Sequence, residues 1–507
     1  MFPKLQNNEH NLTSLFVEGS PFPILGGELR NSAASDLDYM KEHVWPYLRG
    51  LNLNTVVLPV SWETVEPEED HFDFSLLQGL IGQAEKEQFK VVLLWFGLWK
   101  NGESHYVPEW VKTDRKRFFR AIYPDGTVSC TVSPFCEAAV EADRRAFSRL
   151  MCFLREQDRK QTVILVQVEN EVGILGADRD YSEQANSEFT KQIPGEIRTI
   201  YDITGTWKEA FGENAEEIFM AWRYASDLER IASSGKQEYP LPMYVNAWLK
   251  QHPDRAGIYP SGGPVANLIP LWQALAPSLD MISPDIYEPL FGEVCREYAQ
   301  SGNPLFIPEA ARNAKSASRV FYAFGAHHAI GFCPFGIEMV KQEEDNQMSD
   351  EQLSALNIMA DAMNAANTAK YLPVSYRIIE GMYPRLDEKN IGFIQEHPYD
   401  RGKLLDLENY TIQLDFLPGE TGSGGIVLPE KEGFYIAGCN TRFSILPPKG
   451  TDEKVEILRY EEGEFVNGKW KRRRVLNGDE RWDMQLGVTP EVRYIRLQRV
   501  KKRGSRE

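Results

Sequence analysis

The sequence offers little that points to a metal or redox centre. Its 507 residues include 6 cysteines and 8 histidines. The cysteines show no CxxC spacing, which argues against a zinc site and against a dense disulfide framework, so we expect free thiols. His327-His328 is a lone pair without HExxH spacing or a matching third ligand. We therefore expect no bound metal.

Other functional classes are excluded by further absences. No GxGxxG or GxxxxGK[ST] loop is present to hold a nucleotide, and no GxSxG turn carries a serine nucleophile, so no cofactor is expected. The net charge of −18 and the lack of an extended basic stripe argue against a nucleic-acid partner. No run of 18 apolar residues occurs, and the first residues do not resemble a signal peptide. We expect a protein without membrane segments in the cytoplasm, or a secreted or periplasmic one if a signal peptide was removed.

What is present is an alternation of short apolar strands with longer amphipathic segments. This pattern is typical of βα units around a parallel sheet. Eight such pairs before residue 370 predict a (β/α)8 barrel, an α/β fold whose active site lies at the carboxyl ends of the strands. A Ser35 or Asp36 cap is expected to start the first helix. The expected strands are Phe22–Gly27, Thr55–Pro59, Lys90–Phe96, Thr162–Val168, Pro242–Val245, Met281–Ser283, Leu305–Ile307 and Gly331–Phe335.

The character of the sequence changes from about Tyr371 onward. Short alternating runs such as Thr411–Phe416 and Arg493–Leu497 predict a smaller antiparallel, sandwich-like β domain over residues 371–507, after a barrel domain over residues 1–370. The glycine-rich segment Pro418–Gly425 is expected to form an exposed, flexible loop. We expect this domain to support the barrel, and a possible homo-oligomer, rather than to bind sugar.

The strongest functional signal is the end of the fourth strand, where an apolar, mostly β-branched run ends in Gln167, Val168, Glu169, Asn170 and Glu171. A second carboxylate, Glu309, follows the seventh strand on the other side of the predicted barrel mouth. Glycoside hydrolysis requires two carboxylates that flank the sugar, and their separation decides between retention and inversion. The alternative for Glu309 is a rim carboxylate paired with Arg312 or with the backbone.

These residues carry a resemblance to known enzymes. Asn170-Glu171 together with Glu309 resembles glycoside hydrolase clan A, the retaining (β/α)8 glycosidases. The segment Gln167–Gly173 resembles the QVENEYG-type motif of family 35, the β-galactosidases. Further segments resemble the bacterial branch whose barrel precedes a β-rich domain: Gly26–Leu29 with Asn31-Ser32, Glu66-Pro67, Phe72–Phe74, Trp99–Gly102 and Ser283–Tyr287.

The resemblance implies specific roles. Glu171 would be the acid/base and Glu309 the nucleophile, with Asn170 bound to the sugar 2-hydroxyl. Tyr287 would hold the nucleophile oriented and ionised. Glu169 is either a hydrogen-bonding neighbour or buried support for the site, on the same side as Glu171 if the strand continues. The remaining candidates for sugar contacts are Glu28, Trp62, Trp99, Asn246, Trp248 and Glu338.

Two departures from the family pattern concern sugar choice. Leu94–Trp99 stands where better-known members have an ICAEW-type segment, and Arg30 stands where relatives tend to have histidine. Both departures lie in the subsite that would recognise the axial 4-hydroxyl of galactose. The leading hypothesis is a retaining exo-β-galactosidase that removes terminal galactose from an oligosaccharide or glycan by double displacement. The alternatives are a β-glucosidase or another clan A β-glycosidase, and a non-catalytic carbohydrate-binding protein.

Overall fold

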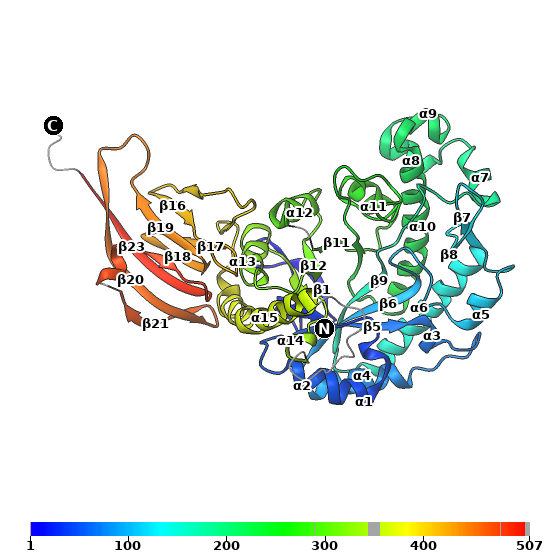
Figure 1. Ribbon diagram of the computed structural model, residues 1–507, viewed down its shortest axis with the longest axis horizontal. Coiled ribbons are helices and arrows are strands. Elements are labelled where there is room, and N and C mark those ends of the chain that lie inside the picture. Colours follow the sequence, from blue (N-terminus) through cyan, green and yellow to red (C-terminus); the bar gives the residue numbers. More distant parts are fainter. Residues whose placement is uncertain (1, 288, 343–354, 477, 502–507) are drawn as a thin grey trace.

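The computed structural model describes residues 2–287, 289–342, 355–476 and 478–501. Eight parallel strands form a closed barrel in its larger part, with helices on the outside (Figure 1). All eight predicted strands are confirmed, and β9 is buried along its whole length, including the polar residues Gln167, Glu169 and Asn170. In order around the barrel, the strands are β4 Ile24–Glu28, β5 Thr55–Ser61, β6 Lys90–Lys100, β9 Val163–Asn170, β10 Met243–Ala247, β11 Met281–Ile286, β12 Phe306–Ala310 and β13 Gly331–Pro334.

The outer helices follow the predicted βα order. Asp36 caps the first of them, because its side chain accepts a hydrogen bond from the backbone nitrogen of Tyr39 at 2.7 Å. A short π-helical stretch, Met40–Val44, interrupts that helix before Trp45–Leu48. The principal helices are α4 Ser75–Lys86, α6 Glu137–Gln157, α10 Ala215–Glu238, α11 Ile269–Leu275, α12 Phe291–Tyr298, α13 Ser316–His327 and α15 Ala355–Met382.

Smaller elements that the sequence did not predict extend this frame. An antiparallel sheet of β1 Lys4–Asn7, β2 Thr13–Val17 and β3 Ser20–Pro21 precedes the first barrel strand. Between β6 and α6 lie α5 Glu109–Thr113 and the hairpin of β7 Arg120–Ile122 and β8 Val128–Val132. Between β9 and α10 lie α7 Glu183–Phe189, α8 Gly195–Tyr201 and α9 Trp207–Phe211. In the described part of the chain, no helix has the length and apolar character needed to span a bilayer.

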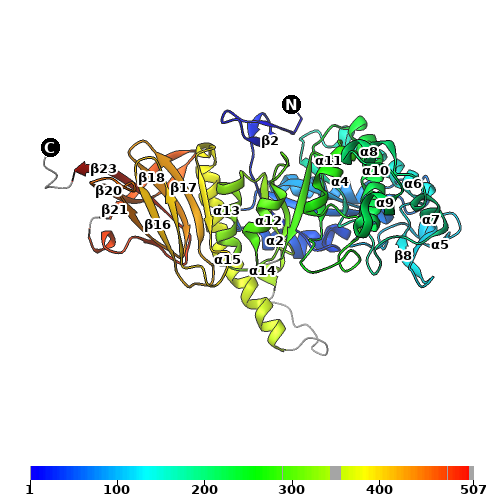
Figure 2. The ribbon, with the colours of Figure 1, turned by 90° about the horizontal axis from the view of Figure 1, so that it is seen from above.

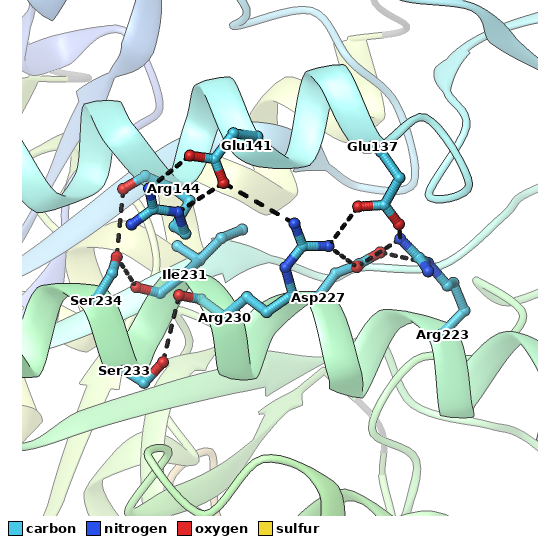
Figure 3. Close-up of polar contacts among 9 residues, drawn as sticks. All are labelled: Glu137, Glu141, Arg144, Arg223, Asp227, Arg230, Ile231, Ser233 and Ser234. Atoms are coloured by element: carbon cyan, nitrogen blue, oxygen red, sulfur yellow. Dashed lines mark hydrogen bonds and ion pairs between the residues drawn. The ribbon is translucent and has the colours of Figure 1, made fainter. Parts of the chain in front are cut away.

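A polar network joins α6 to α10 on the outside of the barrel (Figure 3). Asp227 is buried, and Arg223 approaches its carboxylate at 2.8 Å. Glu137 of α6 accepts from both Arg223, at 2.6 Å, and Arg230, at 2.8 Å. Burial raises the pKa of Asp227 to about 7 despite the two guanidinium groups. The network therefore fixes α6 and α10 against each other through a carboxylate that depends on its arginine partners.

Replacing Arg223 with alanine should destabilise the fold. Breaking a buried ion pair costs about 3 kcal/mol, because the partner charge stays buried. The loss should grow as the pH rises above 7, since Asp227 then ionises and its remaining cation, Arg230, lies 3.5 Å away. Urea unfolding at pH 6 and pH 8.5 measures this effect. Arg144→Ala in the same helix pair is the control: its partner Glu141 is half exposed, so we expect a change below about 1 kcal/mol at both pH values.

The carboxyl-terminal part is a β sandwich, as predicted. One antiparallel sheet has the order β14-β17-β18-β23-β20-β21 and the other β15-β16-β19-β22. Buried side chains of both sheets form one apolar cluster, which includes Phe393, Ile412, Ile436, Phe443 and Ile495. The strands are β14 Ile391–Ile394, β15 Gly402–Asp406, β16 Thr411–Phe416, β17 Gly424–Glu430, β18 Gly433–Cys439, β19 Thr441–Leu446, β20 Glu453–Val466, β21 Lys469–Val475, β22 Gln485–Leu486 and β23 Glu491–Lys501.

The junction between the two parts is a packed surface. Helix α13 of the barrel lies against β14 and β17, and Figure 2 shows α13 beside β17. Ser318 Oγ of this helix donates to the Thr421 carbonyl at 2.6 Å. The boundary expected between residues 370 and 371 falls inside α15, which continues to Met382. The expected exposed loop Pro418–Gly425 is wrong in its second half: Thr421, Ser423 and the two glycines that begin β17 are buried. The sandwich is thus anchored to the outer helices of the barrel.

Candidate active site

Five acidic or amide side chains meet at the carboxyl ends of the barrel strands. Glu28 ends β4, Glu171 follows β9, Asn246 lies in β10, Asp285 in β11 and Glu309 in β12. Glu171 is 7% and Glu309 9% exposed, whereas Glu28 and Asp285 are nearly inaccessible. Each of the four carboxyl groups titrates under the influence of at least one of the others. The two catalytic candidates, predicted from distant parts of the sequence, therefore share one site.

The pKa of Glu309 is raised overall, with burial as the largest cause, but its polar neighbours favour the ionised form. Tyr287 donates its hydroxyl to Glu309 Oε1, as predicted for it, and the Glu28 carboxyl forms a second side-chain hydrogen bond. Burial raises the pKa of Glu309, while Lys100, Tyr287 and Glu28 each lower it. Burial and the charge of Glu309 raise the pKa of Glu28 well above its ordinary value, so Glu28 is the proton donor of that pair. Glu309 thus has the hydrogen-bond donors that a carboxylate nucleophile needs.

The pKa of Glu171 is also raised. Burial, followed by the charge of Glu309, raises its pKa to about 7. Its backbone is left-handed, with φ of 46°, and its backbone nitrogen donates to Asn246 Oδ1 at 2.9 Å. Asn246 Nδ2 in turn donates to Asp285 Oδ2 at 2.6 Å. Asn246 therefore positions the backbone of Glu171, and Glu171 can carry a proton at neutral pH, as a general acid must.

Glu169 supports the site from behind. Its φ of 62° turns the side chain away from the barrel mouth, so the expectation that it faces the same side as Glu171 is wrong. It is fully buried, shares a hydrogen bond with Asp143 of α6, and accepts from the backbone nitrogens of Leu98 at 3.1 Å and Trp99 at 2.7 Å. Burial raises the pKa of both acids. The pair shares a proton and holds the end of β6.

Gly97 lies where this acid pair approaches the backbone. A Cβ atom there would be 2.3 Å from Glu169 Oε1 and 2.7 Å from Asp143 Oδ2. Gly97→Ala should therefore lower stability by roughly 1–3 kcal/mol through overpacking and reduce activity by displacing the end of β6. Thermal unfolding and kinetics measure both effects. The control, Gly82→Ala, has open space at its Cβ on α4 and should stabilise the protein by up to about 1 kcal/mol.

Lys100 brings a positive charge to the mouth. Its ammonium donates to Asn170 Oδ1 at 3.2 Å and to Asn101 Oδ1. Asn170 is fully buried, and within the described part of the chain its Nδ2 has no hydrogen-bond partner. An unpaired buried donor beside two carboxylates is the arrangement expected of a group that binds a substrate oxygen.

The predicted tryptophan platforms are not all at the mouth. Trp62 and Trp99 are fully buried, so the prediction that they contact sugar is wrong. Trp62 Nε1 donates to Glu66 Oε2 at 2.8 Å, and Trp99 Nε1 donates to the Val132 carbonyl at 3.0 Å. Both indoles fill the layer between the barrel and its helices. Trp248 follows β10 and is 37% exposed, which leaves it accessible for stacking.

Glu338 lies at the mouth between β13 and β4. It is buried, and its Oε1 accepts from the backbone nitrogen and the Nε of Arg30, at 3.1 and 3.2 Å. In the described residues its Oε2 has no hydrogen-bond partner, which keeps Glu338 a candidate for a sugar contact. Arg312 donates to the Gly336 carbonyl in the same region.

The sequence interpretation assigned no role to Lys100, Asp285 or Asp143. Lys100 and Asp285 lie within segments that carried the family resemblance, and each is a charged residue at the end of a barrel strand, which is the signal that could have identified them. The predicted strand ends at Phe96, whereas β6 continues for four more residues and includes Lys100. Asp143 lies on α6, and nothing in its sequence context indicates that it faces Glu169.

Comparisons with known proteins match parts of this chain to glycoside hydrolases. Residues 30–219 match the beta-galactosidase model of glycoside hydrolase family 42, and residues 375–486 match a domain of unknown function, DUF5597. Human beta-galactosidase-1-like protein 3 is 26% identical over 177 residues, which are 32% of this chain and 24% of that protein. The chain thus spans about a quarter of that relative. The family match includes Asn170 and Glu171 and supports a glycoside hydrolase.

Solved structures of low sequence identity are similar to part of this chain. The beta-galactosidase from Rahnella sp. R3 is 13% identical with a TM-score of 0.48, and the similarity covers 71% of this chain and 56% of that one. The beta-galactosidase from Bacillus circulans sp. alkalophilus is 14% identical with a TM-score of 0.45, and the similarity covers 62% and 50% of the two chains. The exo-beta-1,4-mannosidase Op5Man5 from Opitutaceae bacterium strain TAV5 is 12% identical with a TM-score of 0.41, and the coverage is 71% and 60%.

Proposed function

We propose that this protein is a retaining exo-β-glycosidase and that its substrate is a terminal β-D-galactosyl residue of an oligosaccharide or glycan. The observation that carries the proposal is that two buried carboxyl groups share one barrel mouth and have different hydrogen-bond partners. Glu309 receives hydrogen bonds from Tyr287 and Glu28, while Glu171 has a pKa raised to about 7. One group is prepared to attack as an anion and the other to give up a proton.

In the first step, Glu309 attacks the anomeric carbon while Glu171 gives its proton to the glycosidic oxygen. The bond to the aglycone breaks, the aglycone leaves as an alcohol, and the sugar becomes esterified to Glu309. Esterification removes the negative charge of Glu309, which is the charge that raises the pKa of Glu171 after burial. Glu171 is thereby prepared to act as a base.

In the second step, Glu171 takes a proton from a water molecule whose oxygen attacks the anomeric carbon. The ester bond breaks, Glu309 returns as a carboxylate, and the sugar leaves with its original anomeric configuration. Tyr287 then donates again to the freed carboxylate. Hydrogen bonds from Asn170 to the sugar 2-hydroxyl would strengthen in both transition states.

Two observations support galactose and exo action. The matching family model is described as beta-galactosidase, and the human relative is named beta-galactosidase-1-like protein 3. The catalytic carboxyl groups are only 7% and 9% exposed, which suits one terminal sugar better than the middle of a long chain. Membership of family 35 is proposed from the motif around Glu171. Another β-glycoside is the alternative substrate, because Arg30 departs from the family pattern at the predicted subsite for the 4-hydroxyl, where it donates to Glu338.

The test is hydrolysis of nitrophenyl β-D-glycosides of galactose, glucose, xylose, fucose and mannose by the purified protein. Preferred cleavage of the galactoside is expected. Preferred cleavage of another glycoside would keep the reaction and replace the sugar. Binding of galactose without hydrolysis of any of the five would contradict the proposed enzyme and favour a carbohydrate-binding protein.

A further inference from the structure

The end of β6 is displaced by a large bulge. Trp95 pairs with Val168 of β9, and the next paired residues are Lys100 and Asn170. Residues 96–99 of β6 therefore lie opposite the single residue Glu169. The proton-sharing pair of Glu169 and Asp143 holds this bulge through the backbone nitrogens of residues 98 and 99. Without the bulge, Lys100 would extend past the end of β9 rather than face Asn170.

The bulge fixes the orientation of the Asn170 amide. A lysine ammonium has three donors and no acceptor, so it must face the amide oxygen. Lys100 Nζ does so, and Asn101 Oδ1 holds the ammonium as well. The amide nitrogen of Asn170 is consequently turned away from Lys100. It is buried and, among the described residues, unpaired.

The same ammonium acts on the catalytic acids. Lys100 favours the ionised forms of Glu28, Glu171 and Glu309. The other titratable groups that influence these three are Asp285, which is hydrogen-bonded to Glu171, and Tyr287, which is hydrogen-bonded to Glu309. Four carboxyl groups in a buried site repel one another when ionised. The positive charge of Lys100 favours the anionic form of Glu309 in this site.

We propose that Lys100 is a positioning residue, which orients the Asn170 amide so that its nitrogen donates to the sugar 2-hydroxyl and which balances the charge of Glu309. This inference rests on the proposed glycosidase function and deepens it. In this proposal, the β6 bulge positions the Lys100 ammonium where its charge acts on Glu309. The buried pair Glu169–Asp143 holds the bulge in place.

The experiment compares an aryl β-galactoside with its 2-deoxy analogue as substrates of the wild type, Lys100→Met, Lys100→Arg and Asn101→Gly. In the wild type, kcat/KM should strongly favour the substrate with the 2-hydroxyl. Lys100→Met should reduce that ratio by roughly tenfold or more, the worth of a hydrogen bond to a charged group. It should also move both limbs of the pH profile upward by about one unit, because the cation no longer favours ionised carboxylates.

The other variants separate the two effects. Lys100→Arg keeps the charge and should keep the pH profile. Asn101→Gly tolerates the left-handed backbone of residue 101, φ 52°, and loosens the ammonium, so it should lower the substrate ratio without moving the pH limbs. Lys112→Met, which removes a half-exposed ion pair with Glu63, is the control for loss of a lysine. Thermal unfolding confirms that each variant is folded.

An unchanged substrate ratio and pH profile in folded Lys100→Met would overturn the inference while leaving the glycosidase in place. If Lys100→Met does not fold, an unchanged ratio in Asn101→Gly overturns the assignment of the amide orientation. Failure of the wild type to cleave any glycoside would instead overturn the proposed function, and this inference with it.

Discussion

Glu309→Gln abolishes turnover and leaves sugar binding in place. The amide cannot attack the anomeric carbon, and removal of a catalytic nucleophile costs on the order of 10⁴–10⁶ in kcat. Binding survives because the substitution preserves the size of a side chain whose neighbours Tyr287 and Glu28 remain. Kinetics on the aryl galactoside and calorimetric titration with galactose measure the two effects.

The matched control for Glu309→Gln is Glu297→Gln on α12, a partly exposed carboxylate outside the mouth, which should behave as the wild type. Residual activity above one per cent in Glu309→Gln, with contaminating wild type excluded, would argue that another group is the nucleophile.

Glu171→Gln separates substrates by their leaving groups. Loss of a general acid should lower kcat/KM by roughly 10²–10⁴ for a glycoside with an unactivated alcohol, but only slightly for a dinitrophenyl glycoside, whose leaving group needs no proton. Added azide should restore kcat on the activated substrate, because it attacks the glycosyl ester without a base. Equal losses on both kinds of substrate, without rescue by azide, would contradict the acid/base role.

The pH profile gives an independent check of the same residue. Wild-type kcat/KM for the unactivated glycoside should fall as the pH rises through about 7, where Glu171 loses its proton. Once this carboxyl group is replaced by an amide, that limb should disappear for the activated substrate. Retention of the limb in Glu171→Gln would assign it to another group.

The barrel and its two candidate catalytic carboxyl groups could be predicted because they depend on local patterns. Strand β9 begins with the apolar run Val163–Val166, and parallel strands bring their carboxyl ends together. That rule places Glu171 and Glu309 at one mouth, and the resemblance of Gln167–Gly173 to a known motif supports their selection. The sandwich was predictable for a similar reason, since its strands alternate apolar and polar side chains.

The remaining features depend on tertiary contacts that no local pattern reports. A position near a strand end does not tell which way a tryptophan points: Trp62 begins a short helix and Trp99 lies in the β6 bulge, so both are buried. The left-handed backbone of Glu169 reverses the side expected from strand alternation. Glycines suggested a loop at Pro418–Gly425, yet Gly425 is required inside β17, where a Cβ would lie 2.3 Å from the Ala437 carbonyl oxygen.

The most direct test of the account is the mass of the covalent intermediate. The wild type is incubated with a 2-deoxy-2-fluoro-β-galactoside that carries a good leaving group, which slows the second step more than the first. We expect the protein to gain the mass of one fluorosugar, with the label on the peptide that contains Glu309. The Glu309→Gln variant should remain unlabelled. A label on another residue, or hydrolysis of aryl galactoside with inversion and no labelled protein, would contradict it.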